Sequence, residues 1–221
     1  MSGAGAPSLR VLRIAGALLV LAALGVTFVA IQGRQGEEGR RLGSLRNLQQ
    51  WGIALNLYLI ENGNELPEVG RAPVTSDQAR AWFNALPPYL SEPPLASLPP
   101  GGRPRPGVPS LWIRPDSRPV KIWDPDVFFF NYGMNAALQP EEGKRSFRIS
   151  ELRFPAQVVF LVPTSDFSPA ASLETTVFSG AGDAHILFCD GHAEAVPRPR
   201  LEDPAALGAA AAADGLSWFR N

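Results

Sequence analysis

The densest apolar stretch of the chain lies near its N-terminus. Residues Ile14 to Ile31 contain no charged side chain. As a helix this stretch would be about 27 Å long, close to the hydrocarbon thickness of a bilayer. It is longer than the apolar region of a cleaved secretory signal, and the bulky Phe28 makes a poor cleavage site. The pattern therefore predicts an uncleaved transmembrane anchor over 14–31, with the lipid bilayer as its partner.

A glycine-rich joint and an amphipathic helix are expected next, over 32–64. Glycines at 33, 36 and 39 predict a flexible joint, because each costs about 1 kcal/mol of helix stability relative to alanine. From Arg40 to Glu61 apolar positions recur with helical spacing, which predicts a helix that packs a leucine stripe on a partner surface. The stripe comprises Leu42, Leu45, Leu48, Leu55 and Leu59. Asn62-Gly63-Asn64 and Pro67 should end this helix.

Beyond residue 64 prolines separate short segments, which predicts a loop-rich domain over 65–221. The expected elements are a helix over Ser76–Leu86, a Pro-rich surface loop over Ser91–Pro109, strands over Pro119–Trp123, Val127–Tyr132, Gln157–Val162 and Thr175–Phe178, and a C-terminal helix between Asp203 and Asp214.

The clearest local signal is a β-hairpin. Two strand-like runs, His185–Cys189 and His192–Val196, are separated by Asp190-Gly191. A two-residue Asp-Gly loop favours a type I′ turn, in which both residues have positive φ. That register would pair Cys189 with His192 and His185 with Val196.

Composition and charge narrow the classes of function. The 221 residues include 20 Lys and Arg against 21 Asp and Glu, so the net charge of −1 offers no attraction to nucleic acid, and none is expected as a partner. Cys189 is the one cysteine, which excludes an intrachain disulfide and a CxxC metal or redox site.

Catalytic motifs are absent from the sequence. There is no HExxH, GxSxG or Walker P-loop, so no enzymatic activity and no cofactor are predicted. Asp183, His185, Asp190 and His192 are metal-ligand types within one hairpin, but the expected register puts the two imidazoles roughly 13 Å apart. The favoured interpretation is a turn aspartate and ordinary strand histidines, with no catalytic, cofactor-binding or metal-binding residue.

Aromatic residues are the other candidates for binding. Flat apolar rings with polar edges suit a glycan or peptide groove, but such residues more often form the core, which is the favoured interpretation. The set is Trp82, Trp112, Trp123, Phe128, Phe129, Phe130, Tyr132 and Trp218.

Several motifs resemble those of bacterial type IV pilin-like proteins and type II secretion pseudopilins. The segments that carry this resemblance are Arg41–Tyr58 and Glu61–Pro67. Ala81–Leu90, Asn131–Asn135 and Phe188-Cys-Asp-Gly-His192 are similar to one branch, the prepilin-type, processing-associated proteins abundant in Planctomycetes and Verrucomicrobia. The usual processing site, a glycine followed by a hydrophobic residue with glutamate at the fifth mature position, is missing, and no acidic residue precedes Glu37.

The resemblance implies a fold and a function. The implied fold is α+β: a long N-terminal helix, half transmembrane and half amphipathic, packed on an antiparallel sheet with long loops. Residues 1–13 would be cytoplasmic, 14–31 would cross the inner membrane once, and the C-terminal domain would be periplasmic. The expected function is that of a structural subunit of a type IV pilus- or type II secretion-like filament, assembling with copies of itself or with other pilin-like subunits. The alternative that stays open is a membrane-tethered periplasmic module that binds glycan or peptide.

Overall fold

The computed structural model describes residues 36, 38–117, 124, 126–165 and 167–202. The expected anchor over 14–31, residues 1–13, the expected strand over Pro119–Trp123 and the expected C-terminal helix from Asp203 lie outside these residues. Within the described part of the chain, no helix has the length and apolar character needed to cross a membrane. The chain divides into two compact units, 1–40 and 41–221, and the second holds the sheet and both hydrophobic cores.

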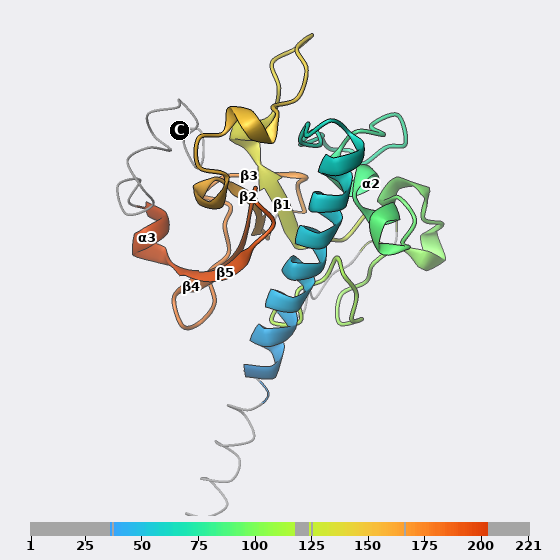
Figure 1. Cartoon of the computed structure of the whole chain (residues 1–221). Coiled ribbons are helices and arrows are strands. Elements are labelled where there is room, and N and C mark those ends of the chain that lie inside the picture. Colours follow the sequence, from blue (N-terminus) through green and yellow to red (C-terminus); the bar gives the residue numbers. More distant parts are fainter. Residues whose placement is uncertain (1–35, 37, 118–123, 125, 166, 203–221) are drawn as a thin grey trace, which may run out of the picture. The chain divides into compact units, whose positions relative to one another are not determined.

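A long helix opens the described part and ends at residue 61, as the sequence predicts. Residues 36 and 38–40 are already helical, so the prediction of a flexible joint is wrong for Gly36 and Gly39, while Gly33 lies outside the described residues. At its end the Asn64 N–H donates to the Leu59 carbonyl (2.8 Å), and Asn64 adopts a left-handed φ of 63°. The Asn-Gly-Asn sequence thus stops the helix through its tolerance of positive φ. The helix runs across the near side of the unit, with the sheet on one flank and α2 with its neighbouring turns on the other (Figure 1).

A five-stranded sheet forms the other layer. Its strand order is β3-β1-β2-β4-β5, and all neighbouring pairs are antiparallel except β1 and β3, which are parallel. The strands are β1 Tyr132–Asn135, β2 Val159–Pro163, β3 Ala170–Ala171, β4 Asp183–Phe188 and β5 Ala193–Pro197. The α+β class is as expected, but the sheet is mixed and not purely antiparallel.

Parallel pairing at β3 depends on a glycine of β1. A Cβ at Gly133 would lie 2.8 Å from the Cβ of Ala171 and 3.1 Å from the Ser168 carbonyl oxygen. Because Gly133 carries no side chain, β3 can approach it closely enough to pair. The two-residue β3 was not expected from the sequence.

Two of the expected strands are wrong. The run Val127–Tyr132 enters the sheet only at its last residue, because β1 begins at Tyr132. Phe129 and Phe130 are buried without ladder pairing, so their apolar character reflects packing and not strand pairing. Thr175–Phe178 forms no strand and touches the sheet through one isolated bridge between Thr164 and Thr176. The expected strand over Gln157–Val162 is confirmed in substance by β2.

The hairpin of β4 and β5 is confirmed, but its register differs by one residue. His185 pairs with Ala195, and the loop has three residues, Cys189 to Gly191. Of these only Gly191 has positive φ (88°). Cys189 joins the loop because its N–H donates to the carbonyl of Val158, the residue before β2 (2.9 Å), and Asp190 accepts the His192 N–H (3.1 Å). A positive-φ glycine in the last loop position is typical of three-residue hairpins.

Short helices and turns complete the fold. The helix expected over Ser76–Leu86 is confined to α2, Trp82–Ala85, because the Gln78 side chain binds the backbone of Arg71 and Pro73 and holds the preceding residues in a turn. The Pro-rich loop is not wholly a surface loop, since Leu95 is fully buried. The remaining elements are 3₁₀ turns at Pro87–Leu90, Leu95–Ser97, Pro100–Gly102, Ala136–Leu138, Ile149–Glu151 and Pro155–Gln157, and helix α3 at Arg198–Glu202.

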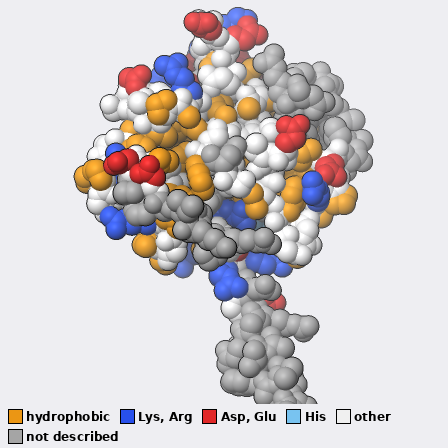
Figure 2. Space-filling view, turned by 180° about the vertical axis from the view of Figure 1, so that it is seen from behind, with side chains coloured by type: hydrophobic (Ala, Val, Ile, Leu, Met, Phe, Trp, Pro, Cys, Tyr) orange, Lys and Arg blue, Asp and Glu red, His pale blue; other side chains and the backbone are white. Residues whose placement is uncertain are grey.

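Each face of the sheet carries its own core. The larger core joins the long helix, α2 and one sheet face, and its centre is a cluster in which Trp51 meets Trp82 (5.6 Å between centroids) and Trp112 (4.8 Å). The smaller core lies on the opposite face, where Phe188 and Val196 pack with Leu201 of α3. Seen from behind, the described surface is mostly uncharged, with apolar side chains between polar ones and charged groups scattered toward the margin (Figure 2).

Candidate functional site

The long helix has two apolar faces, of which only one packs on its own unit. Leu48, Leu55 and Leu59 are at most 5% exposed and enter the larger core, as the leucine stripe predicts. Leu42 is 67% exposed, so the prediction is wrong for this member of the stripe. It lies on the outward face of the helix together with Ile53 (56% exposed), Leu57 (42%) and Ile60 (75%). These four residues are called the outer stripe below.

Spacing places the outer stripe on one face of the helix, and its last three residues form a continuous ridge. Ile53, Leu57 and Ile60 follow at i, i+4 and i+7, which places them on one face over two turns. Leu42 lies three turns earlier on the same face. The exposed positions between Leu42 and Ile53 are Arg46, Gln49 and Gln50, so the face carries little charge. Such a ridge has the geometry that packs into the groove of another helix.

The turn of the hairpin docks on the side of the long helix. A Cβ at Gly52 would lie 2.2 Å from the Gly191 carbonyl oxygen, and a Cβ at Gly191 would lie 2.3 Å from Nδ2 of Asn56. Two glycines therefore permit backbone-to-backbone contact between helix and turn. Residues 41–58 and 188–192, two of the segments that carry the pilin-like resemblance, meet at this point.

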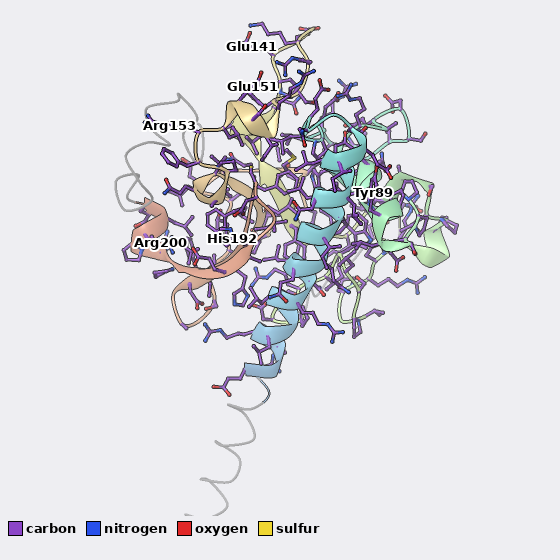
Figure 3. The ribbon with its side chains drawn as sticks, in the orientation of Figure 1. Tyr89, Glu141, Glu151, Arg153, His192 and Arg200 are labelled. Atoms are coloured by element: carbon purple, nitrogen blue, oxygen red, sulfur yellow. The ribbon has the colours of Figure 1, made fainter. Side chains whose placement is uncertain are left out.

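The four metal-ligand types of the hairpin do not converge on one point. His185 and His192 lie on opposite faces of β4 and β5, since His192 stacks on Phe188 (4.4 Å between centroids) and His185 alternates with it along β4. Asp183 pairs with Arg41, and Asp190 with Nδ1 of His192 (2.6 Å). Figure 3 shows His192 on the hairpin and Arg200 farther along, on α3. No group of three or more potential metal ligands occurs among the described residues.

His185 is buried on strand β4. It is 8% exposed, and burial lowers its pKa below the ordinary value of 6.5. Asp116 and Asp183 oppose that shift, while Arg114 and Arg41 add to it. The imidazole therefore stays neutral in the fold at neutral pH, as expected of a structural strand histidine.

The aromatic residues form core and not a groove. Trp82, Trp112, Phe129, Phe130 and Tyr132 are each at most 4% exposed, which confirms the favoured interpretation for these five. Phe128 is half-buried, with the Arg103 guanidinium over its ring (4.2 Å to the centroid). Trp123 and Trp218 lie outside the described residues. Tyr58 of the long helix and Tyr89 form a second aromatic pair (6.0 Å between centroids). Figure 3 shows Tyr89 beside the later turns of the helix.

Sequence reasoning missed a buried polar cluster. Arg114 and Asp116, whose side chains are 7% and 11% exposed, form a two-pronged ion pair with Nε–Oδ1 and Nη2–Oδ2 distances of 3.1 and 2.8 Å. The Ser44 hydroxyl of the long helix donates to the same carboxylate. Burial acts to raise the pKa of Asp116, but the bonds from Arg114 and Ser44 outweigh it and lower the pKa below 3.8. No local sequence pattern signals this cluster, because Arg114 and Asp116 flank a proline in a segment typical of surface loops.

Comparison with known proteins identifies no relative of this chain. No protein-family model matches the chain, and neither a curated protein nor a solved structure matches it.

Proposed function

We propose that this protein is a membrane-anchored, pilin-like structural subunit that assembles through the long helix with a second copy of itself. The observation that carries the proposal is the outer stripe. A helix that already buries one apolar face would normally present a polar face to water. Here Leu42, Ile53, Leu57 and Ile60 remain exposed on the outward face, which supports a helical partner.

Charge and sequence favour a second copy as that partner. The chain has a net charge of −1, so two copies repel each other little. The anchor expected over 14–31 would hold copies side by side in one membrane, and lateral contact would then bring their outer stripes together. Association among pilin-like subunits at an inner membrane, with the C-terminal domain periplasmic, follows from the same expectation.

Cysteine crosslinking in native membranes tests this proposal. The native thiol of Cys189 is buried, and burial raises its pKa far above the usual range, so it should not compete. Full-length protein carrying Ile53→Cys or Ile60→Cys should form a covalent dimer with a short bismaleimide. Ser97→Cys, on an exposed turn away from the long helix, is the matched control.

The test compares the yield of crosslinked dimer at the two helix positions with the yield at the control position. Dimers from the two helix positions and monomer from Ser97→Cys would support assembly through the outer stripe. Monomer at all three positions, or equal crosslinking at all three, would overturn it. The described tryptophans are buried, so no observation favours the alternative of a tryptophan-lined glycan groove.

A further inference from the structure

A polar cavity lies apart from the outer stripe and has no role in the assembly proposed above. Its volume is about 320 Å³, within the range of sites that hold small organic molecules. Three parts of the second unit line it: the ion pair of Arg114 and Asp116, the chain around Thr164 that follows β2, and the stretch from Val177 to Gly180. None of the outer-stripe residues lines it.

Two donor atoms in its wall bond to no acceptor among the described residues. Nε and Nη2 of Arg114 are used by Asp116, but Nη1 makes no hydrogen bond to any described residue. Asn131 is 5% exposed and its Oδ1 accepts the Arg114 backbone N–H (3.3 Å), which fixes the orientation of the amide. Its Nδ2 has no hydrogen-bond partner in the described part of the chain. Both donor atoms are open to the cavity, where they can bind the acceptor of a ligand.

The one carboxylate among the described residues of the cavity wall, that of Asp116, is already bonded. Both oxygens of Asp116 receive bonds from Arg114, and Oδ1 also receives the Ser44 hydroxyl. The groups that can donate a hydrogen bond to a ligand are therefore a guanidinium N–H, an amide N–H and the hydroxyls of Ser117 and Ser165. A carboxylate, with two adjacent acceptor oxygens and a charge that strengthens each bond, suits this surplus of donors.

The remaining wall is apolar and locally strained. Phe167, Val177 and Phe178 line it. Phe167 holds a left-handed φ of 54° and packs on Phe129 (4.5 Å between centroids). A bulky residue seldom adopts that conformation, and such strain concentrates at ligand-binding sites. The two phenylalanines provide an apolar surface beside the free donors.

We propose that this cavity binds a small carboxylate that carries an apolar group, with the carboxylate on Nη1 of Arg114 and Nδ2 of Asn131 and the apolar group against Phe167 and Phe178. The same chemistry occurs in a free organic acid and in the C-terminal residue of a peptide. The cavity is large enough for one such residue and too small for a folded segment.

Calorimetric titration of the full-length protein in detergent micelles tests the proposal with defined probes. 3-Phenylpropanoate represents the free acid and Gly-Gly-Phe the peptide end, and each is compared with its carboxamide. At least one acid should give saturable binding, with its amide weaker by about tenfold or more, because a charged acceptor is lost. Preference between the two acids identifies the source of the carboxylate.

Variants at the cavity give the matched comparison. Ser165 is exposed at the rim, so Ser165→Trp should block the cavity without disturbing the core, whereas Ser76→Trp, on another exposed turn, should leave binding unchanged. Asn131→Asp keeps the acceptor for the Arg114 N–H but replaces the free donor with a negative charge, and should weaken acid binding about tenfold or more. Absence of saturable binding for both acids, equal affinity for acid and amide, or full binding by Ser165→Trp would overturn the proposal.

Discussion

The carbonyl oxygen of Gly191 lies so close to the backbone of Gly52 that a Cβ on Gly52 would be only 2.2 Å from it. The hairpin turn and the middle of the long helix are thus in direct backbone contact. This contact joins the sheet to the helix at a point where neither residue can carry a side chain.

Gly52→Ala should therefore destabilise the protein even though alanine favours a helix. The intrinsic gain of about 1 kcal/mol is outweighed by the need to move the turn, and we expect a net loss of about 1–3 kcal/mol in the free energy of unfolding. Urea unfolding, followed by tryptophan fluorescence, measures this free energy. Gly101→Ala, where a Cβ would meet nothing within 4 Å, should change the value by less than about 0.5 kcal/mol. Equal stability of both variants would show that the contact is not tight.

The second prediction compares the two apolar faces of the long helix, one of which packs on its own unit while the other is proposed to join two copies. Leu55→Ala removes a fully buried side chain and should cost about 2–5 kcal/mol. Leu57→Ala, two residues on and 42% exposed, should cost less than about 0.5 kcal/mol. Crosslinking through Ile53→Cys should decline in the Leu57→Ala background if the outer stripe joins two copies. A large stability loss for Leu57→Ala would place that face inside the fold of a single chain.

The buried His185 predicts a pH dependence near neutrality. Because its pKa is lowered in the fold, the unfolded chain binds the proton more readily. The neutral, buried His185 therefore contributes stability that is fully present above the ordinary pKa of 6.5 and is lost as the pH falls toward the lowered pKa. The free energy of unfolding changes over that interval with a limiting slope of about 1.4 kcal/mol per pH unit. Unfolding free energies measured between pH 7.5 and 5 should fall less steeply for His185→Gln than for the native protein.

His192→Gln is the control for that experiment, since the chain has two histidines. This side chain lies on the opposite sheet face and is 40% exposed. If His192→Gln removed the pH dependence of the free energy of unfolding and His185→Gln kept it, the pH dependence would belong to His192 and not to His185.

The ion pair of Arg114 and Asp116 predicts a strong effect of breaking it from one side. Asp116→Leu leaves a buried guanidinium without its partner and should cost about 3–5 kcal/mol of unfolding free energy, whereas Arg114→Met with Asp116→Leu should cost less. The lowered pKa of Asp116 adds a stabilisation that is present above pH 3.8 and is lost as the pH falls through the lowered value. Additive losses in the double variant would contradict coupling between the two side chains.

The parts of the fold that the sequence predicted correctly are those determined by residues close together in the chain. The end of the long helix, the position of the hairpin and the buried leucines depend on neighbours a few residues apart. The hairpin register was missed because the Cys189 N–H donates to the carbonyl of Val158, just before β2, a contact that no local rule contains. The strand expected over Val127–Tyr132 was placed too early in the chain, because the buried aromatic residues Phe129 and Phe130 resemble the pattern of a strand.

The candidate sites were harder to predict than the fold. The leucine pattern did not predict the outer stripe, because it leaves out Ile53 and Ile60, whose exposure depends on which face of the helix the sheet covers. Arg114 and Asp116 meet Ser44 from a distant part of the chain, so their burial is a product of tertiary structure. Proline-flanked charged residues are ordinarily solvated, and only packing reveals the exception.

The strand order also limits how copies of this unit can meet. One edge of the sheet is β3, which has only two residues, and the other is β5, which ends at Pro197 and carries Glu194. Short, charged or proline-bounded edges offer a neighbour little backbone to pair with. Self-association by strand addition, the route toward aggregates, is thereby disfavoured at both ends of the sheet, and contacts between copies are left to side chains on helices and loops.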